Sequence, residues 1–284
     1  MIRFLHRNLQ IYYRDKATVF ISLIGTLMIF VLYILFLGDL WEHTFDDIKN
    51  VRHLIDSWVM ASIISVVSVT ATLGNLGIMV NDKSTQRIKD FYSSPVKRSD
   101  IAGGYILSAT VVGLIMSMIM LVLAEIYIVL MGGPLLSVGA LLRLTGLIVL
   151  VSLSNTSTML FFASFFTSHN AYTSAAGMIA SFIGFIAGAY IPIGLLPKYI
   201  QWIVEPLPLF QGAALLRQSM IYGMFDSSFI GMSQQKIMEF NNTFGITTQI
   251  GKYQVSPILS LIILVASIAI FFFLSVWNLS KKNQ

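Results

Sequence analysis

The sequence of 284 residues contains no cysteine, and charged side chains make up only 11% of it. The absence of cysteine excludes a disulfide framework, a thiolate metal site and an iron–sulfur cluster. A soluble globular domain carries about 25% charged residues, so a soluble enzyme, a disordered tail and a fibrous protein are excluded. The chain is instead rich in apolar residues, with 56% hydrophobic side chains and a mean hydropathy of +0.79. This composition predicts an integral membrane protein.

A membrane-spanning helix needs about 20 mostly apolar residues to cross about 30 Å of hydrocarbon. Six stretches of the sequence meet this requirement: 17–38, 57–80, 101–131, 144–166, 172–195 and 255–279. The first is longer than the apolar core of a signal peptide and has no small-residue cleavage site, so we expect it to be retained. The sequence therefore predicts an all-α membrane protein with six transmembrane helices in a single domain, residues 1–284.

The basic residues are unevenly divided between the two sides of the predicted membrane protein. If the N-terminus is inside, the segments on that side hold eleven of the 18 Lys and Arg residues, and the outer loop 39–56 holds five acids. Short loops rich in Lys and Arg stay in the cytoplasm, so both termini are expected there, in the plasma membrane. This bias explains the basic charge without nucleic acid as a partner.

The first sixteen residues combine a helical apolar pattern with basic side chains. Ile2, Leu5 and Leu9 recur at helical spacing, with Arg3 and Arg7 mostly on other faces. This pattern predicts an amphipathic helix lying on the inner leaflet before the first span. An unstructured basic tail is the alternative.

The motifs that would indicate an enzyme are absent from the sequence. The one Gly-Lys pair, Gly251-Lys252, lacks the glycine and the hydroxyl residue that a phosphate-binding loop requires. There is no His-Glu-x-x-His motif and no Gly-x-Ser-x-Gly motif, and the four histidines are scattered. We therefore expect no catalytic residue, no metal and no cofactor.

The polar loop 81–100 between the second and third spans carries a short amphipathic pattern. Ile88, Phe91 and Tyr92 are spaced i, i+3, i+4, which predicts a short helix outside the membrane. A turn, Ser94-Pro95-Val96-Lys97-Arg98, then leads into the third span. This loop resembles the coupling loop of the permease subunits of type-2 ABC exporters, the drug-resistance and polysaccharide-export permeases. It departs from that family at Gln86-Arg87-Ile88-Lys89, where Gly-Thr-Leu-Glu is common.

The resemblance implies that this loop docks on a separate ABC ATP-binding subunit, which binds the ATP. By position, it assigns the ATPase contact to five residues: Ile88, Phe91, Tyr92, Pro95 and Arg98. Phe91 and Tyr92 are expected to form an apolar knob that enters a cleft of the ATPase. A surface-bound helix without a partner is the alternative that the amphipathic pattern alone leaves open.

A second segment resembles the same family. Pro192, Pro197, Pro208 and Arg217 fall in the family's register, although Ala187 and Leu207 stand where Ser and Asn are favoured. The resemblance implies the outer end of span five followed by short re-entrant helices. Proline breaks helices and leaves carbonyls free, which is tolerated at membrane depth only where protein or water satisfies them. A plain extracellular loop is the alternative.

Three further features bear on assembly and gating. Glu125 is the one acid within a predicted span, and its place near the outer interface leaves open an interfacial role or a part in gating or substrate release. Gly184 and Gly188 form a Gly-x-x-x-Gly pair, which permits close helix contacts. The resemblance implies that two copies meet along spans one and five. Gly184, Gly188, Pro192 and Pro197 are therefore candidates for the dimer interface or gate.

These observations predict a membrane permease subunit of an ATP-driven ABC exporter, working as a homodimer in the lipid bilayer. The apolar spans and modest outer loops favour an amphipathic drug, toxin or peptide-like substrate. The alternative is an ATPase-independent channel or secondary transporter. That alternative favours several buried charges within the spans, where the sequence offers Glu125 alone.

Overall fold

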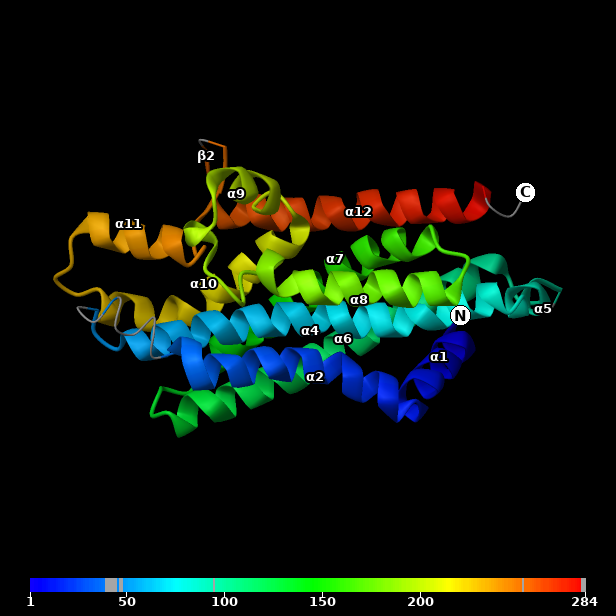
Figure 1. Ribbon diagram of the computed structural model, residues 1–284, viewed down its shortest axis with the longest axis horizontal. Coiled ribbons are helices and arrows are strands. Elements are labelled where there is room, and N and C mark those ends of the chain that lie inside the picture. Colours follow the sequence, from blue (N-terminus) through cyan, green and yellow to red (C-terminus); the bar gives the residue numbers. More distant parts are fainter. Residues whose placement is uncertain (39–44, 46–47, 94, 252, 282–284) are drawn as a thin grey trace.

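The computed structural model describes residues 1–38, 45, 48–93, 95–251 and 253–281, with side chains at all of these except 37, 92, 98–99, 226–227 and 279–281. Long helices lie roughly alongside one another and form an elongated bundle (Figure 1). The predicted all-α membrane architecture is confirmed in this coarse form, because the described chain is mostly helical.

The N-terminal half of the bundle consists of the following elements: α1 Ile2–Arg14, α2 Lys16–Leu32 with a π-helical turn Tyr33–Leu37, α4 Val51–Ser84, α5 Arg87–Ser93, α6 Arg98–Leu130 and α7 Val138–Ser164. Helix α1 confirms the predicted helix at the N-terminus. Asp15 separates it from α2, because its carboxylate accepts hydrogen bonds from Thr18 N and Thr18 Oγ1 at 3.1 and 2.7 Å and so caps the next helix.

The C-terminal half has shorter elements between two long helices. They are α8 His169–Ile186, a 3-10 turn Ile193–Leu195, α9 Lys198–Val204, α10 Pro208–Ser228, α11 Gln234–Thr243, strands β1 Thr248–Ile250 and β2 Tyr253–Val255, and α12 Pro257–Lys281. The two strands form an antiparallel hairpin in which Gln249 lies opposite Gln254. The all-α prediction did not include this hairpin.

Five described helices are long and apolar enough to cross a membrane: Lys16–Phe36, Val51–Ser84, Asp100–Leu130, Val138–Ser164 and Pro257–Asn278. They correspond to the predicted spans one, two, three, four and six. The second and fourth begin earlier than predicted, at Val51 and Val138 rather than at residues 57 and 144. The apolar runs alone did not locate these ends, because the helices continue into polar residues.

The predicted fifth span, 172–195, is shorter in the structure and is not among these five helices. Helix α8 ends at Ile186, well before residue 195. The chain turns there because Gly188 adopts a left-handed φ of +67°, and Ala189 N donates to Gly184 O at 2.7 Å. Pro192 follows, which cannot continue a helix. Helix α8 still lies along α4, where Tyr172 Oη donates to Leu73 O at 2.6 Å.

The predicted short re-entrant helices correspond to one short and one long helix. Helix α9 has 7 residues, but α10 has 21 and is not short. Pro208 occupies the first turn of α10, where its missing N–H costs nothing. Helix α10 packs against α4 and α7, so this segment belongs to the core of the bundle.

Helix α4 forms the centre of the molecule. In its most apolar stretch 83% of the residues are buried, against 22% for α2 and for α12. Helices α2, α6, α7, α8 and α10 surround it. Buried polar side chains join it to these neighbours: Ser68 to Ser152 at 3.3 Å and Asn75 to Ser108 at 2.9 Å. Such small polar groups allow close helix packing inside a membrane protein.

The two ends of the bundle differ in what they carry. The N-terminus, the last turns of α12 and α5 lie at one end, called here the α5 end (Figure 1). Helix α11 lies toward the opposite end, called here the hairpin end, together with α9 and the β1–β2 hairpin that leads into α12. The predicted coupling loop and the predicted re-entrant segment are therefore on opposite sides of the bundle.

Candidate functional site

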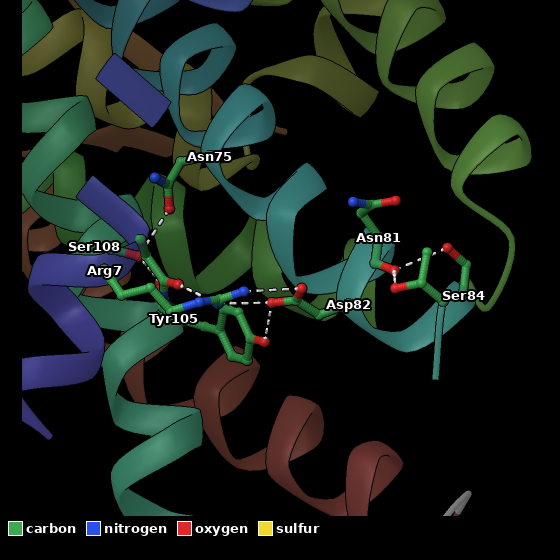
Figure 2. Close-up of polar contacts among 9 residues, drawn as sticks. Arg7, Asn75, Asn81, Asp82, Ser84, Tyr105 and Ser108 are labelled. Atoms are coloured by element: carbon green, nitrogen blue, oxygen red, sulfur yellow. Dashed lines mark hydrogen bonds and ion pairs between the residues drawn. The ribbon is translucent and has the colours of Figure 1, made fainter. Parts of the chain in front are cut away.

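At the α5 end, the chain leaves the bundle as a separate short helix. Helix α4 ends where Ser84 Oγ and Thr85 Oγ1 both donate to Asn81 O, at 3.0 and 2.8 Å (Figure 2 labels Asn81 and Ser84). Gln86 then takes a left-handed φ of +60°, which reverses the chain before α5 begins at Arg87. The short helix predicted within loop 81–100 is confirmed.

Asp82, in the last turn of α4, is the centre of a polar cluster at the base of this loop. Its carboxylate is only 1% exposed. Asp82 Oδ2 accepts from Arg7 Nη1 at 2.8 Å and from Tyr105 Oη at 2.7 Å, and Asp82 Oδ1 accepts from Arg7 Nη2 at 3.1 Å (Figure 2). These three residues, called here the Asp82 junction, connect α1, α4 and α6 through a single carboxylate.

The Arg7 guanidinium of the Asp82 junction keeps its charge. Burial lowers the pKa of the Arg7 guanidinium, but the hydrogen bonds and charge of Asp82 outweigh this effect and hold that pKa above its ordinary value. The two parallel hydrogen bonds also fix the relative orientation of the two side chains. The junction is therefore a rigid connection between α1 and α4.

Phe91 of α5 packs against this junction. Its ring lies edge-to-face with Phe4 of α1, with centroids 5.1 Å apart, and Arg7 Cζ lies 4.9 Å from the Phe91 ring centroid. Phe4 also contacts the ring of Tyr105, at 5.0 Å between centroids. Phe91 was expected to point out of the chain as a knob. The structure places its half-buried ring against α1, so Phe91 fastens α5 to the bundle.

The outward surface of the loop has a different character. Arg87, Lys89 and Asp90 are exposed on α5, and Pro95 is exposed in the turn before α6, while Ile88 is half-buried. The side chains of Tyr92 and Arg98 lie outside the described part of the structure. A partner that approaches α5 from outside therefore meets charged groups and Pro95 before it meets Phe91.

A family comparison covers this whole region. The family of ABC-2 type transporters matches residues 2–221, more than three quarters of the chain. The chain belongs to this family. No match to a curated protein accompanies the family match. The resemblance drawn from loop 81–100 and from Pro192 to Arg217 is confirmed, since both segments lie within the matched residues.

Membership of the ABC-2 type transporter family gives the chain a general role. It is the permease component of an ABC-2 type transporter, a multi-pass membrane protein and not itself the ATPase. Permeases of this family work with an ATP-binding subunit. The matched residues include α1, α4, α5 and α6, so the Asp82 junction belongs to the part of the chain that the family defines.

The structure places Glu125 near the hairpin end of α6. It is 8% exposed, and its Oε2 accepts from Leu136 N at 3.2 Å, across the connection to α7. Its other carboxylate oxygen has no hydrogen-bond partner within the described residues. Glu125 therefore fixes the segment between α6 and α7 to the end of α6.

The space beside the two predicted interface glycines, in α8 and just after it, is occupied by side chains of the same chain. A Cβ at Gly184 would overlap the ring of Tyr190, and a Cβ at Gly188 would lie 2.7 Å from Arg217 Nη2. Both glycines are buried. Their missing side chains make room for Tyr190 and Arg217 of the same chain. Pro192 is buried before the 3-10 turn, and Pro197 is the exposed residue that precedes α9.

Arg217 of α10 is the buried group whose role the sequence left unassigned. Its side chain is 0% exposed, and its guanidinium donates to Ser62 Oγ at 3.0 Å, to Gly245 O at 3.3 Å and to Ala187 O. Ala187 is the residue at which α8 stops, so its carbonyl has no helical partner. Arg217 thus satisfies the Ala187 carbonyl that the broken helix leaves free, together with a carbonyl that follows α11. Its register match to the family was the one signal in the sequence.

Proposed function

We propose that this permease is the membrane subunit of an ATP-driven exporter and that α5 is its contact with the ATP-binding subunit. In this proposal the α5 end lies in the cytoplasm. The observation that carries it is the Asp82 junction: α5 rests through Phe91 on α1, and Arg7 and Asp82 join α1 to α4 and α6. A displacement of α5 therefore acts on two of the membrane-crossing helices at once.

The contact surface on α5 consists of the outward groups together with residues that the family register assigns. Arg87, Lys89 and Asp90 form its charged part, and Ile88, Tyr92, Pro95 and Arg98 complete it. Phe91 lies behind this surface and connects α5 to α1. When the nucleotide-bound ATPases close, they displace α5. Because Phe91 of α5 rests on Phe4 and Arg7 of α1, this displacement also moves α1. The permease itself needs no cofactor for this step.

The assembly proposed is a homodimer with six spans per copy, in the plasma membrane with both termini inside. The basic bias of the termini and of loop 81–100 supports this orientation. Helix α8 counts as the fifth span, because it lies along α4 at the same level as the longer helices. The apolar faces that α2 and α8 turn outward, such as Phe20, Ile21, Met178 and Phe182, support a seam between two copies. In this proposal Gly184, Gly188, Pro192 and Pro197 act on the seam indirectly: the two buried glycines make room for Tyr190 and Arg217, and the prolines shape the chain after α8.

The proposed substrate is an amphipathic drug, toxin or peptide-like molecule, moved outward. A cavity of about 560 Å³ at the hairpin end supports this class. It is lined by apolar groups such as Ile221, Phe225 and Val255 and by uncharged polar groups such as Gln218 and Asn241. Ligand pockets for drug-sized molecules commonly enclose about 300–1,000 Å³ with this mixture of side chains.

The experiment that tests the proposal is co-purification with a co-expressed ABC ATP-binding subunit. The double substitution Arg87→Glu and Lys89→Glu reverses the outward charge of α5 and should abolish co-purification and ATP-dependent transport. The matched control, Lys198→Glu with Lys236→Glu, reverses two exposed charges at the hairpin end and should retain both. If the α5 variant still binds the ATPase and transports like the wild type, α5 is not the contact with the ATP-binding subunit. Transport by the wild type without any ATPase would favour the channel or secondary-transporter alternative.

A further inference from the structure

A second buried carboxylate lies at the opposite end of α4. Asp56 is 0% exposed, and three groups converge on its Oδ1: Tyr33 Oη at 2.5 Å, Tyr127 Oη at 3.3 Å and Arg52 Nε at 3.4 Å. Tyr33 belongs to the π-helical turn of α2, Tyr127 to α6, and Arg52 to α4 itself. These four residues, called here the Asp56 clamp, join three membrane-crossing helices at the hairpin end.

At its hairpin end, α2 makes a ring contact to α6, between Phe30 and Tyr127, and its polar contact is the Tyr33 hydroxyl of the clamp. Most of α2 is exposed, and the residues after Tyr33 turn outward, with Leu35 63% exposed and Phe36 67% exposed. Tyr33 itself is fully buried. It is also where α2 changes from α-helical to π-helical hydrogen bonding, and such turns in long helices are frequent at functional sites. Beyond Tyr33, the described part of α2 shows no polar contact to the bundle.

The clamp differs in kind from the Arg217 contacts at the same end. Apart from its bond to Ser62 Oγ, Arg217 binds backbone carbonyls, which belong to the main chain after α8 and α11. The clamp consists of side-chain bonds between separate helices. Its tyrosines are removable partners, whereas Arg52 lies four residues before Asp56 on the same helix and stays beside it. If α2 and α6 separate from α4, Asp56 therefore keeps its counter-charge.

The surroundings of the clamp also favour reversible opening. Asp56 Oδ2 has no hydrogen-bond partner within the described residues, so the carboxylate has unused accepting capacity. Arg52 is partly exposed, which brings water close to the cluster. Water that enters at Arg52 can replace the tyrosine hydroxyls as donors to the carboxylate. Opening then exchanges hydrogen bonds without leaving a buried charge unpaired.

We propose that Asp56 is a positioning residue that holds the hairpin end of α2 closed against α4 and α6, and that transport opens this clamp. The clamp itself follows from the contacts above, while its opening during transport rests on the proposed function. In the closed state Asp56 accepts from Tyr33 and Tyr127, and α2 is fixed. In the open state both hydroxyls bind water, and the outer part of α2 moves away from α6.

The test measures the distance between α2 and α6 in the permease alone, in lipid nanodiscs. Because the chain has no cysteine, spin labels can be attached at Leu35→Cys and Leu130→Cys, two exposed positions at this end. Labelled copies are diluted into unlabelled ones, so that only the distance within one copy is measured. The wild type should then show one distance, and the clamp variants Tyr33→Phe and Asp56→Asn should show a second, longer one. Its population should rise about tenfold, or about 1.4 kcal/mol, as expected when a hydrogen bond to a charged group is lost.

The control is Tyr172→Phe, which removes another buried tyrosine hydroxyl bonded to α4, at 2.6 Å from Leu73 O. It should leave the distance between the labels unchanged. Unaltered distances in Tyr33→Phe would overturn the clamp. This variant keeps the buried ring, so we expect it to fold. The test therefore stands even if Asp56→Asn does not fold. In the complex with the ATPase, the clamp variants should hydrolyse ATP with at least fivefold less transport per ATP, or about 1 kcal/mol of coupling.

The two proposals fail in distinguishable ways. Loss of the ATPase partner in the wild type would contradict the exporter, yet would not alter the distances measured in the permease alone. Normal ATPase binding with unchanged distances in the clamp variants would contradict the clamp only. A clamp variant that shows the longer distance but transports at the wild-type ratio would show that the clamp fixes α2 without taking part in the transport cycle.

Discussion

Arg7 and Asp82, 75 residues apart in the chain, meet in a two-bond ion pair at 2.8 and 3.1 Å. Arg7 lies on the helix before the first membrane-crossing helix, and Asp82 lies at the end of the second. The pair therefore fixes α1 beneath the bundle and gives Phe91 of α5 a surface to rest on.

The Arg7–Asp82 ion pair should be the main polar support of the α5 end. Arg7→Ala leaves Asp82 buried without a cation, which should lower the free energy of unfolding by about 3–5 kcal/mol. Arg7→Lys keeps the charge but not the two parallel bonds, so its loss should be smaller. Denaturant unfolding in detergent measures both. Arg3→Ala, at an exposed position of the same helix, is the control and should be close to the wild type.

The Phe4–Phe91 contact should couple α5 to α1. In a double-mutant cycle of Phe4→Ala and Phe91→Ala, the two losses of stability should not add, with a coupling of about 0.5–1.5 kcal/mol as measured for aromatic pairs. Both single variants should also weaken the stimulation of the ATPase by the permease. Strict additivity would show that the rings act independently and that α5 is not held through Phe4.

Gly188 should not tolerate a side chain. Gly188→Ala places a Cβ 2.7 Å from Arg217 Nη2 at a φ of +67°, and such backbone strain costs about 1–3 kcal/mol. Gly177→Ala, within the preceding helix α8, meets nothing within 4 Å and should stabilise the helix by about 0.5–1 kcal/mol. Thermal unfolding of the two variants measures the difference. Equal stability would contradict the placement of Arg217 against Gly188.

Glu205, between α9 and α10, should make stability depend on pH. Burial raises the pKa of its carboxyl group, although the Gln249 N–H and the charge of Lys198 act against this shift. Because the folded-state pKa lies above that of the unfolded chain, the folded protein binds more protons. Stability should therefore fall as the pH rises from the unfolded pKa of Glu, about 4.3, through the folded value. Glu205→Gln should flatten the unfolding free energy over that range.

The orientation of the bundle can be read with single cysteines, since the chain has none. Ser84→Cys at the α5 end should resist an impermeant thiol reagent in intact cells and react after the membrane is opened. Glu239→Cys, on α11, should react in intact cells. Both positions are exposed in the chain. Labelling at Ser84→Cys from outside would reverse the proposed topology.

Much of the architecture was predictable because a membrane imposes local rules. A crossing helix must be about 20 apolar residues long, so five spans could be read from composition alone. The short helix in loop 81–100 followed from the spacing of Ile88 and Phe91. Pro192 indicated a break in this region, but the predicted span 172–195 ran past the end of α8 at Ile186. These signals depend on residues close together in the chain, and the family register of Pro192 to Arg217 added the identity.

The tertiary structure alone decided what the buried charges do. Asp82 read as part of a polar loop, Asp56 as the last acid before a span, and Arg217 as a register match, because their partners lie 75, 23 and 155 residues away. The direction of Phe91 was also hidden, since an amphipathic pattern gives a face but not the surface it meets. A buried charge is stable only where the fold brings a partner to it, and which distant residue arrives there depends on how all the helices pack.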